Sequence, residues 1–159
     1  MKIGVSGQIG YKRAFELLEE NREYLEKRFP VFFLEQFVAK KDSSHYIMKN
    51  IISREIKEGG IFRALWEICD EAGCGCEVRI RDIPVLQEVV EIMECFDENP
   101  YESICGNAYI CIADELPEGF ALIGETNKSK NRVLVDGEAK RFLTPPSRQE
   151  KDILDRKRK

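Results

Sequence analysis

Apolar and charged residues alternate at helical spacing near the start of the chain. Over residues 11–29 this pattern predicts an amphipathic helix, and Pro30 ends it because the residue before a proline avoids helical geometry. Residues 31–40 carry a denser set of apolar positions and predict a second, shorter helix. Residues 1–10 contain three glycines and alternate only weakly, which indicates a short strand or a glycine-rich lead-in.

A third helix is expected after residue 42. Ser43 or Ser44 can cap its first turn, because a serine hydroxyl accepts hydrogen bonds from the exposed N–H groups of a helix start. The inward positions of this helix would be Ile47, Ile51 and Ile52. Residues 53–58 are then expected to form a loop.

The strongest pattern lies in residues 59–72. One apolar stripe at helical spacing consists of Ile61, Ala64, Leu65, Ile68 and Ala72, and a second consists of Phe62, Trp66 and Cys69. Two stripes predict a helix that is buried on two sides. A Gly59-Gly60 pair opens this helix, and Gly73 follows it as a natural left-handed cap.

The second half of the chain alternates in the manner of strands. Residues 76–81, 107–113 and 119–124 each predict a strand, and apolar residues on both faces of 107–113 indicate an interior place in the sheet. Asp136-Gly137 lies between two further strand patterns, at 132–135 and 138–142, and predicts a hairpin.

One more helix is expected between the first two of these strands. Asp82 and Pro84 would start it, since proline is favoured in the first turn of a helix. Its buried face would consist of Leu86, Val89, Val90, Met93 and Phe96. After it, Asn99-Pro100 can cap a short helical turn.

Together these elements predict an α/β fold in which a mixed β-sheet packs with helices. The chain has 159 residues, of which 43% are apolar, and this is enough for one domain with a substantial core. We expect a single domain over residues 1–150, with a helical lead-in at 1–58 and a core at 59–146. Residues 151–159 are expected to be a solvated basic tail.

Charge and cysteine content exclude several classes of function. The net charge of −4 comes without a basic stripe, so nucleic-acid binding is not expected. No membrane span or signal peptide is visible in the sequence, and we expect a cytoplasmic protein without a membrane partner. The six cysteines form no Cys-x-x-Cys pair and the only histidine is His45, which disfavours a metal site and a catalytic triad. No catalytic residue is assigned.

The candidate site is the helix start at Gly59-Gly60. The free N–H groups and the partial positive charge of a helix start can hold an anion such as phosphate, and glycine leaves room for it. The candidate ligand-binding residues are Glu55, Glu58, Gly59 and Gly60, with Arg54 and Lys57 nearby to favour an anion. The alternative is a purely structural turn in which Glu58 interacts with the helix dipole.

Several short motifs occur in a recognisable order along this part of the chain. They are Glu58-Gly59-Gly60 before the central helix, Ile83-Pro84-Val85, Asn99-Pro100-Tyr101 and Pro145-Pro146. This order resembles the C-terminal domain of the aminoimidazole ribonucleotide (AIR) synthase superfamily, and within it the hydrogenase-maturation branch. The resemblance covers residues 50–150 well and residues 1–49 loosely. It implies the layered fold of that domain and a glycine loop that helps to hold a substrate phosphate, with Glu55 in place of the family's aspartate.

The same resemblance implies what the chain does. Members of the superfamily have an N-terminal domain that carries most of the ATP and metal ligands and forms the dimer, and residues 1–59 are too few to hold it. We therefore expect a chain that is non-catalytic alone and needs no cofactor. It would act as a binding or assembly module, by self-association or with a separate N-terminal-domain protein. The alternative is the C-terminal half of a split ATP-dependent enzyme, where ATP and Mg²⁺ would require that partner.

Two further features bear on assembly and on the size of the domain. Phe32, Phe33 and Phe37 follow a proline, and Trp66 lies on the second stripe of the central helix. These residues indicate either a helix layer that covers the sheet or an interface with another molecule. Residues 114–119 are too few for the packed helix that the family usually places there.

Overall fold

The computed structural model describes residues 1–41 and 52–145. Its helices are α1 (Tyr11–Glu20), α2 (Arg22–Arg28), α3 (Val31–Ala39), α4 (Gly60–Ala72) and α5 (Gln87–Glu94), with short 3₁₀ turns at Ile80–Asp82 and Pro100–Glu102. Its strands are β1 (Lys2–Ser6), β2 (Ile52–Glu55), β3 (Gly75–Arg79), β4 (Tyr109–Ala113), β5 (Ala121–Asn127), β6 (Arg132–Asp136) and β7 (Ala139–Phe142). The predicted α/β class is confirmed.

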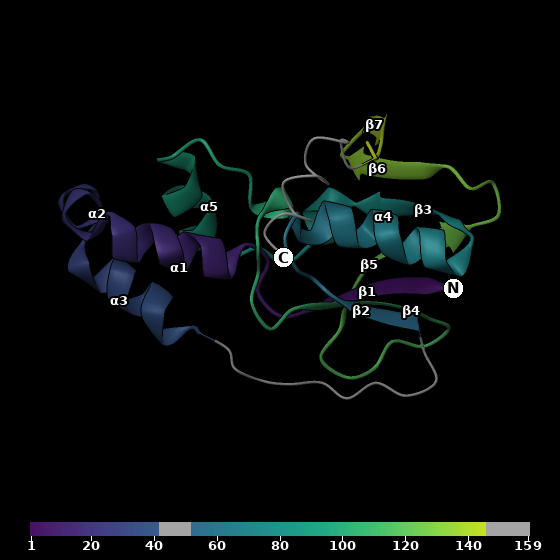
Figure 1. Cartoon of the computed structure of the whole chain (residues 1–159), viewed down its shortest axis with the longest axis horizontal. Coiled ribbons are helices and arrows are strands. Elements are labelled where there is room, and N and C mark those ends of the chain that lie inside the picture. The colour runs from purple at the N-terminus through teal and green to yellow at the C-terminus, as the bar shows by residue number, and fades with distance from the viewer. Residues whose placement is uncertain (42–51, 146–159) are drawn as a thin grey trace, which may run out of the picture.

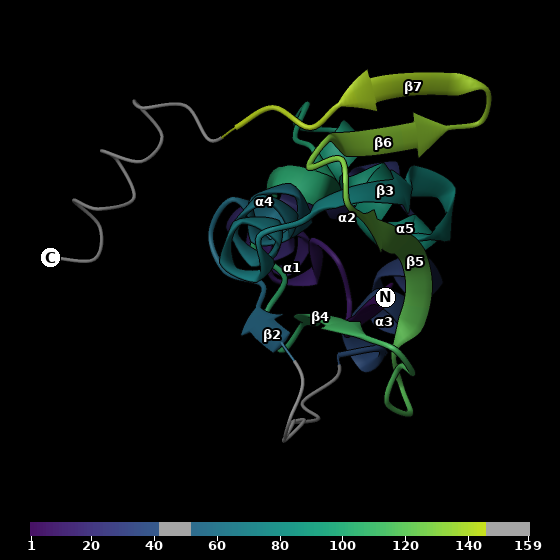
Figure 2. The same ribbon diagram turned by 90° about the vertical axis from the view of Figure 1, so that its right-hand side faces the viewer.

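The seven strands form one mixed sheet in the order β2-β4-β1-β5-β3-β6-β7. β3 and β6 are parallel, and all the other neighbours are antiparallel. The sheet curls around α4, which lies on its concave side (Figure 2). β1 lies in the interior of the sheet, between β4 and β5, and β2 lies at one edge. The sheet therefore contains strands that come before and after the Gly59-Gly60 pair in the sequence.

The main hydrophobic core lies between α4 and the concave face of the sheet. Ile61, Leu65 and Ile68 of α4 are fully buried there, as the first predicted stripe requires. Phe62 and Cys69 of the second stripe are also buried, while Trp66 is partly buried. Burial of each large apolar side chain contributes about 1.5–3 kcal/mol, so α4 holds the curved sheet together.

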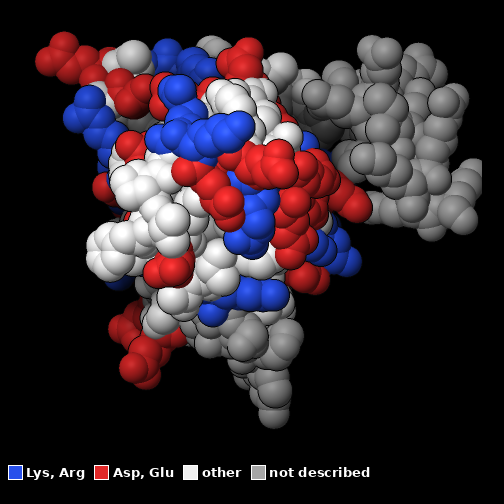
Figure 3. All heavy atoms as spheres, turned by 90° about the vertical axis from the view of Figure 1, so that its left-hand side faces the viewer, with Lys and Arg blue, Asp and Glu red and all other residues white. Residues whose placement is uncertain are grey.

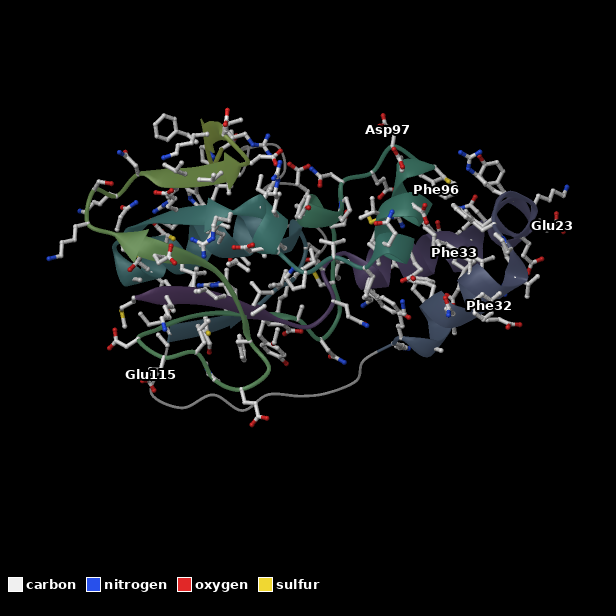
Figure 4. The ribbon with its side chains drawn as sticks, turned by 180° about the vertical axis from the view of Figure 1, so that it is seen from behind. Glu23, Phe32, Phe33, Phe96, Asp97 and Glu115 are labelled. Atoms are coloured by element: carbon white, nitrogen blue, oxygen red, sulfur yellow. The ribbon has the colours of Figure 1, made fainter. Side chains whose placement is uncertain are left out.

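The other helices form a second core at one end of the sheet. Figure 1 shows α1, α2, α3 and α5 gathered there, away from α4. Phe37 and Met93 are fully buried in this cluster, and the ring of Phe33 stacks on that of Phe29 with centroids 4.7 Å apart. Phe32, beside Phe33 on α3 in Figure 4, is 69% exposed. These helices pack on one another and do not form a layer over the sheet.

The predicted helix over residues 11–29 is wrong in one respect, because two helices occupy this range. α1 ends at Glu20 and α2 begins at Arg22. Asn21 between them has φ −130° and ψ 35°, and its side-chain amide donates to the Leu17 carbonyl oxygen at 3.1 Å. Asparagine competes for backbone hydrogen bonds in this way, which interrupts the helix.

Two other boundaries differ from the sequence prediction. Residues 52–55 form strand β2, paired with β4, where a loop was expected from residue 53. The third predicted helix lies outside the described residues except for Ile52, which begins this strand. β2 could not be predicted because its four residues show no clear alternation of apolar and polar positions. Its stability comes from pairing with β4, which is distant in the sequence.

The helix predicted from Asp82 and Pro84 begins later, at Gln87. Leu86 has extended backbone geometry, so Pro84 precedes the helix without starting it. Val89 and Met93 are buried as predicted, but Val90 is exposed and Ile92 takes its place in the core. The preceding strand also ends earlier than predicted, at Arg79, where a 3₁₀ turn follows.

Several predictions are confirmed. α4 and its flanking glycines agree with the sequence pattern. The predicted hairpin of β6 and β7 is present, but its turn lies one residue later than predicted, at Gly137 and Glu138, because Asp136 still pairs with Ala139. Gly137 is in the left-handed region at φ 63°. The side chain of Asn99 accepts from the Tyr101 N–H at 2.9 Å and caps a short 3₁₀ turn. β4 pairs with a strand on each side, so its predicted interior position is correct.

Two further properties concern the distribution of surface charge and the apolar character of the helices. Basic and acidic side chains intermingle on the helical face drawn in Figure 3. Within residues 1–41 and 52–145, no helix combines the length and the apolar character that crossing a membrane requires.

Candidate functional site

The helix α4 starts at two glycines with left-handed backbone geometry. Gly59 has φ 89° and Gly60 has φ 68°. A Cβ atom on Gly60 would lie 2.5 Å from the Tyr101 carbonyl oxygen and 2.6 Å from the Ser103 nitrogen, which is too close for any side chain. The Gly60 N–H donates to the Lys57 carbonyl oxygen at 3.0 Å. The pair therefore turns the chain tightly from β2 into α4, against the segment at residues 101–103.

A cavity of about 490 Å³ opens beside this turn. Its wall combines the end of β2, the turn that follows and the first part of α4. The residues that line it are Arg54, Glu55, Lys57, Glu58, Arg63, Ala64 and Glu67. Two of the four candidate ligand-binding residues, Glu55 and Glu58, thus lie on one cavity wall. Gly59 and Gly60 shape the turn but are not among these lining residues.

Two arginines meet at one carboxylate in the cavity wall. The Arg63 Nε donates to one oxygen of Glu67 at 2.8 Å, and the Arg54 Nη1 donates to the other at 3.0 Å. Arg54 also bonds Glu71 at 3.3 Å. The side chain of Arg63 is only 11% exposed, so this charge-assisted network fixes both guanidinium groups in place.

Donor groups remain unused in this network. Arg54 Nε and Arg63 Nη1 are buried and have no hydrogen-bond partner among the described residues. A buried donor without a partner costs about 1–3 kcal/mol, which an acceptor on a ligand would recover. Lys57, on the same wall, forms no ion pair within the described part of the chain. The wall therefore offers three cationic groups with spare capacity for an anion.

Part of this set of cavity residues was predicted from the sequence. The prediction included Glu55 and Glu58 as ligand-binding residues and Arg54 and Lys57 as nearby cations, but not Arg63 and Glu67. These two residues lie four positions apart on α4 and form an i,i+4 ion pair, which the sequence does display. The pairing of Arg54 with Glu67 could not be foreseen, because it depends on where β2 lies against α4.

The glycine-rich segment before α1 has no comparable capacity. The Lys12 and Arg13 N–H groups donate to the carbonyl oxygens of Cys105 and Ile104, both at 3.2 Å. The Gly10 N–H points to the Cys105 sulfur at 3.2 Å. These donors at the start of α1 are therefore already occupied by the chain itself.

A second cavity, of about 350 Å³, lies beside α1 and includes Tyr11, Phe15 and Lys41 in its wall. The Tyr11 hydroxyl donates to the Phe37 carbonyl oxygen at 2.7 Å, inside the helical core. Burial, with a smaller effect of the Glu88 charge, raises the pKa of Tyr11 to about 12. Tyr11 therefore stays neutral at ordinary pH and acts as a structural donor.

All six cysteines carry free thiols. Among the described residues, no three histidine, cysteine, aspartate or glutamate side chains are grouped so that they could hold a metal ion. Cys105 and Cys111 are buried, and burial raises their pKa values to about 12 and about 11. Such thiols behave as small apolar groups in the core.

Comparison with known proteins identifies solved structures with a similar fold. No protein-family model and no curated protein sequence matches this chain. Solved structures do match it. HypE from E. coli, a hydrogenase maturation protein, has a TM-score of 0.67 at 20% identity over 91% of this chain and 49% of its own. HypE in complex with ATP gives 0.65 at 17% identity, covering 92% of this chain and 51% of HypE. Thiamine monophosphate kinase from Aquifex aeolicus gives 0.57 at 18% identity, with 88% and 51% covered.

These matches confirm the predicted resemblance at the level of the fold. HypE and thiamine monophosphate kinase are members of the AIR synthase and hydrogenase-maturation superfamily, and the curved sheet around α4 is the fold shared with them. The chain spans about half the length of these proteins.

Proposed function

We propose that this chain is a non-catalytic binding and assembly module whose cavity beside the start of α4 holds a phosphate-sized anion. The observation that carries the proposal is the convergence of Arg54, Lys57 and Arg63 on one cavity, with two buried guanidinium N–H groups that lack a partner in the described part of the chain. Guanidinium groups suit phosphate because their planar array of donors matches its oxygens.

The acidic residues of the cavity would set its selectivity. Glu67 holds the two guanidinium groups in position, so its charge is already compensated. Glu55 and Glu58 remain on the wall and oppose a highly charged ligand. This balance favours a monoester or a single phosphate group over a bare triphosphate, because each further negative charge meets the two glutamates.

Assembly is the second part of the proposal. The chain spans about half the length of the HypE structures that it resembles, and one similar structure is a complex of HypE with HypF, which supports a role in assembly. At the helical end, Val31 and Phe32 are 62% and 69% exposed and offer an apolar contact. Large exposed apolar side chains of this kind are typical of interaction surfaces.

Calorimetric titration tests the anion site. Inorganic phosphate, ribose 5-phosphate and ATP are titrated into the purified protein and into Lys57→Gln and Arg63→Gln. We expect binding of the two smaller ligands, weakened about tenfold by either substitution, because one charge-assisted hydrogen bond contributes about 1.5 kcal/mol or more.

Arg22→Gln, on the exposed surface of α2, is the matched control for the loss of one positive charge and is expected to leave binding unchanged. Lys57→Gln removes no ion pair of the described residues, so it separates ligand binding from folding. Absence of heat with all three ligands, from folded protein, would contradict the proposal.

A second candidate function is one half of a split ATP-dependent enzyme. It is supported by the similarity to a HypE structure that was solved with ATP. Under this hypothesis the isolated chain stays inactive, and ATP hydrolysis appears only when a separate protein supplies the other half. A stable homodimer without nucleotide binding favours the assembly module, whereas a monomer that gains activity with such a protein favours the enzyme half.

A further inference from the structure

Three cysteines come together where α4 ends and β3 begins. Cys69 lies in the last turns of α4, Cys74 follows Gly73, and Cys76 is the second residue of β3. Cys69 and Cys76 are fully buried, and Cys74 is partly exposed. Figure 1 shows α4 running directly into β3 at this point. The cluster therefore has a single thiol within reach of solvent.

The geometry of the helix end brings the first two thiols into contact. The Cys74 N–H donates to the Cys69 carbonyl oxygen at 3.1 Å, and the Gly73 N–H donates to that of Asp70 at 3.3 Å. Gly73 has φ 66°. These features define a Schellman motif, in which the residue after the left-handed glycine packs on the side chain five positions before it. In this chain both residues of that contact are cysteines.

The three thiols affect one another's ionisation, with Cys69 between the other two. Cys69 interacts with both Cys74 and Cys76, and the interaction with Cys69 lowers the pKa of Cys76. Burial and the neighbouring Cys69 raise the pKa of Cys74. Cys74 is therefore a thiol at neutral pH and reacts through the fraction that loses its proton to water.

A cation lies next to the cluster. The Arg132 guanidinium lies 3.9 Å from the centre of the Trp66 ring, and its side chain is 14% exposed. Its Nε is buried and has no hydrogen-bond partner among the described residues. Burial is the largest effect on Cys74 and raises its pKa, and the Arg132 charge offsets part of this rise. Asp70, 3.6 Å from Arg132 and largely exposed, is the nearby opposing charge.

We propose that Cys74 and Cys69 form a site of reversible thiol–disulfide exchange with small disulfides such as oxidised glutathione, and that the product is a Cys69–Cys74 disulfide. The cluster supplies what such a site requires, which is an accessible sulfur in contact with a second one that can resolve the mixed disulfide.

The exchange takes two steps. The Cys74 thiolate, after loss of its proton to water, attacks one sulfur of the small disulfide, whose S–S bond breaks and releases one thiolate. The Cys69 thiol then loses its proton, and its sulfur attacks Cys74 and expels the second thiolate. Both released thiolates take up protons. Two protein thiols are thus oxidised, and one small disulfide is reduced to two thiols.

The test treats the folded protein with oxidised glutathione, blocks free thiols with N-ethylmaleimide under denaturing conditions and maps the products by peptide mass spectrometry. We expect a peptide with a Cys69–Cys74 bond and without bound glutathione. In Cys69→Ser, Cys74 is expected to keep a glutathione adduct, because no neighbouring sulfur resolves it.

Cys95 provides the control within the same molecule. It is partly exposed, and its sulfur donates to the Glu91 carbonyl oxygen without a second cysteine beside it. Cys95 is therefore expected to form only a glutathione adduct, and Cys95→Ser should not affect the Cys69–Cys74 bond. A wild-type protein in which Cys74 keeps the adduct while Cys69 stays reduced would overturn the proposal. So would a Cys69–Cys76 bond that forms equally in Cys74→Ser.

Discussion

Single polar side chains hold the helical end of the molecule in place. The Tyr11 hydroxyl bonds the Phe37 carbonyl oxygen, and Tyr11 and Phe37 rings lie 4.7 Å apart. Nearby, the carboxylate of Glu88 is buried and accepts from Lys40 at 2.8 Å. Each contact joins α1 or α5 to the end of α3, so these residues help to hold the helices against one another.

The raised pKa of Tyr11 predicts a loss of stability at high pH. Its folded-state pKa of about 12 lies above the usual value of about 10, so the folded protein keeps this proton longer than the unfolded chain. The resulting stability is fully present below about pH 10 and is lost as the pH rises to about 12. Urea unfolding of wild type and Tyr11→Phe across this range measures it.

The wild type is expected to lose stability more steeply than Tyr11→Phe between these two pH values. The difference between the two proteins cancels the contributions of buried thiols, such as Cys105, that titrate in the same range. Parallel pH profiles for the two proteins would contradict the role given to this hydroxyl.

At the scale of elements, the two ends of α4 use glycine for different reasons. Gly73 has φ 66° but open space where a Cβ atom would be, so only its backbone conformation requires glycine. Gly60 has a similar φ of 68°, and in addition the backbone of residues 101–103 touches it. The start of α4 thus packs tightly against the backbone of residues 101–103, while a Cβ atom at Gly73 would contact nothing.

This difference predicts unequal costs for the same substitution. Gly73→Ala is expected to lower the free energy of unfolding by about 1 kcal/mol, the cost of a left-handed alanine. Gly60→Ala adds a collision with backbone that cannot move away, and is expected to cost about 3 kcal/mol in total. Thermal and urea unfolding of the two variants measure both values. Equal losses would show that residues 101–103 yield without cost.

At the scale of the whole molecule, the fold follows from a pattern that is largely visible in the sequence. α4, the hairpin of β6 and β7 and the interior strand β4 were predictable because period and turn chemistry agree there. β2 and the break at Asn21 were not, because they depend on pairing with β4 and on one side-chain hydrogen bond. The interior position of β1, between β4 and β5, also could not be predicted from the sequence.

The candidate site was predictable only in outline. Glu55 and Glu58 are close to the glycine pair in sequence, so a local motif identifies them. The cavity also needs Arg54 and Arg63, which meet only because β2 lies beside the first turns of α4. Residues that converge through tertiary packing leave no local pattern, and this is why the cationic wall was missed in part.

The most direct test of the anion site observes the arginine side chains themselves. In ¹H–¹⁵N spectra of the arginine Nε–H groups, inorganic phosphate is titrated into wild type and Lys57→Gln, and Arg54→Lys and Arg63→Lys assign the signals. We expect the Arg54 Nε–H, which is buried and has no partner among residues 1–41 and 52–145, to shift in a saturable manner, and we expect Lys57→Gln to weaken this response. Unchanged Arg54 and Arg63 signals, with shifts confined to exposed arginines such as Arg22, would contradict it.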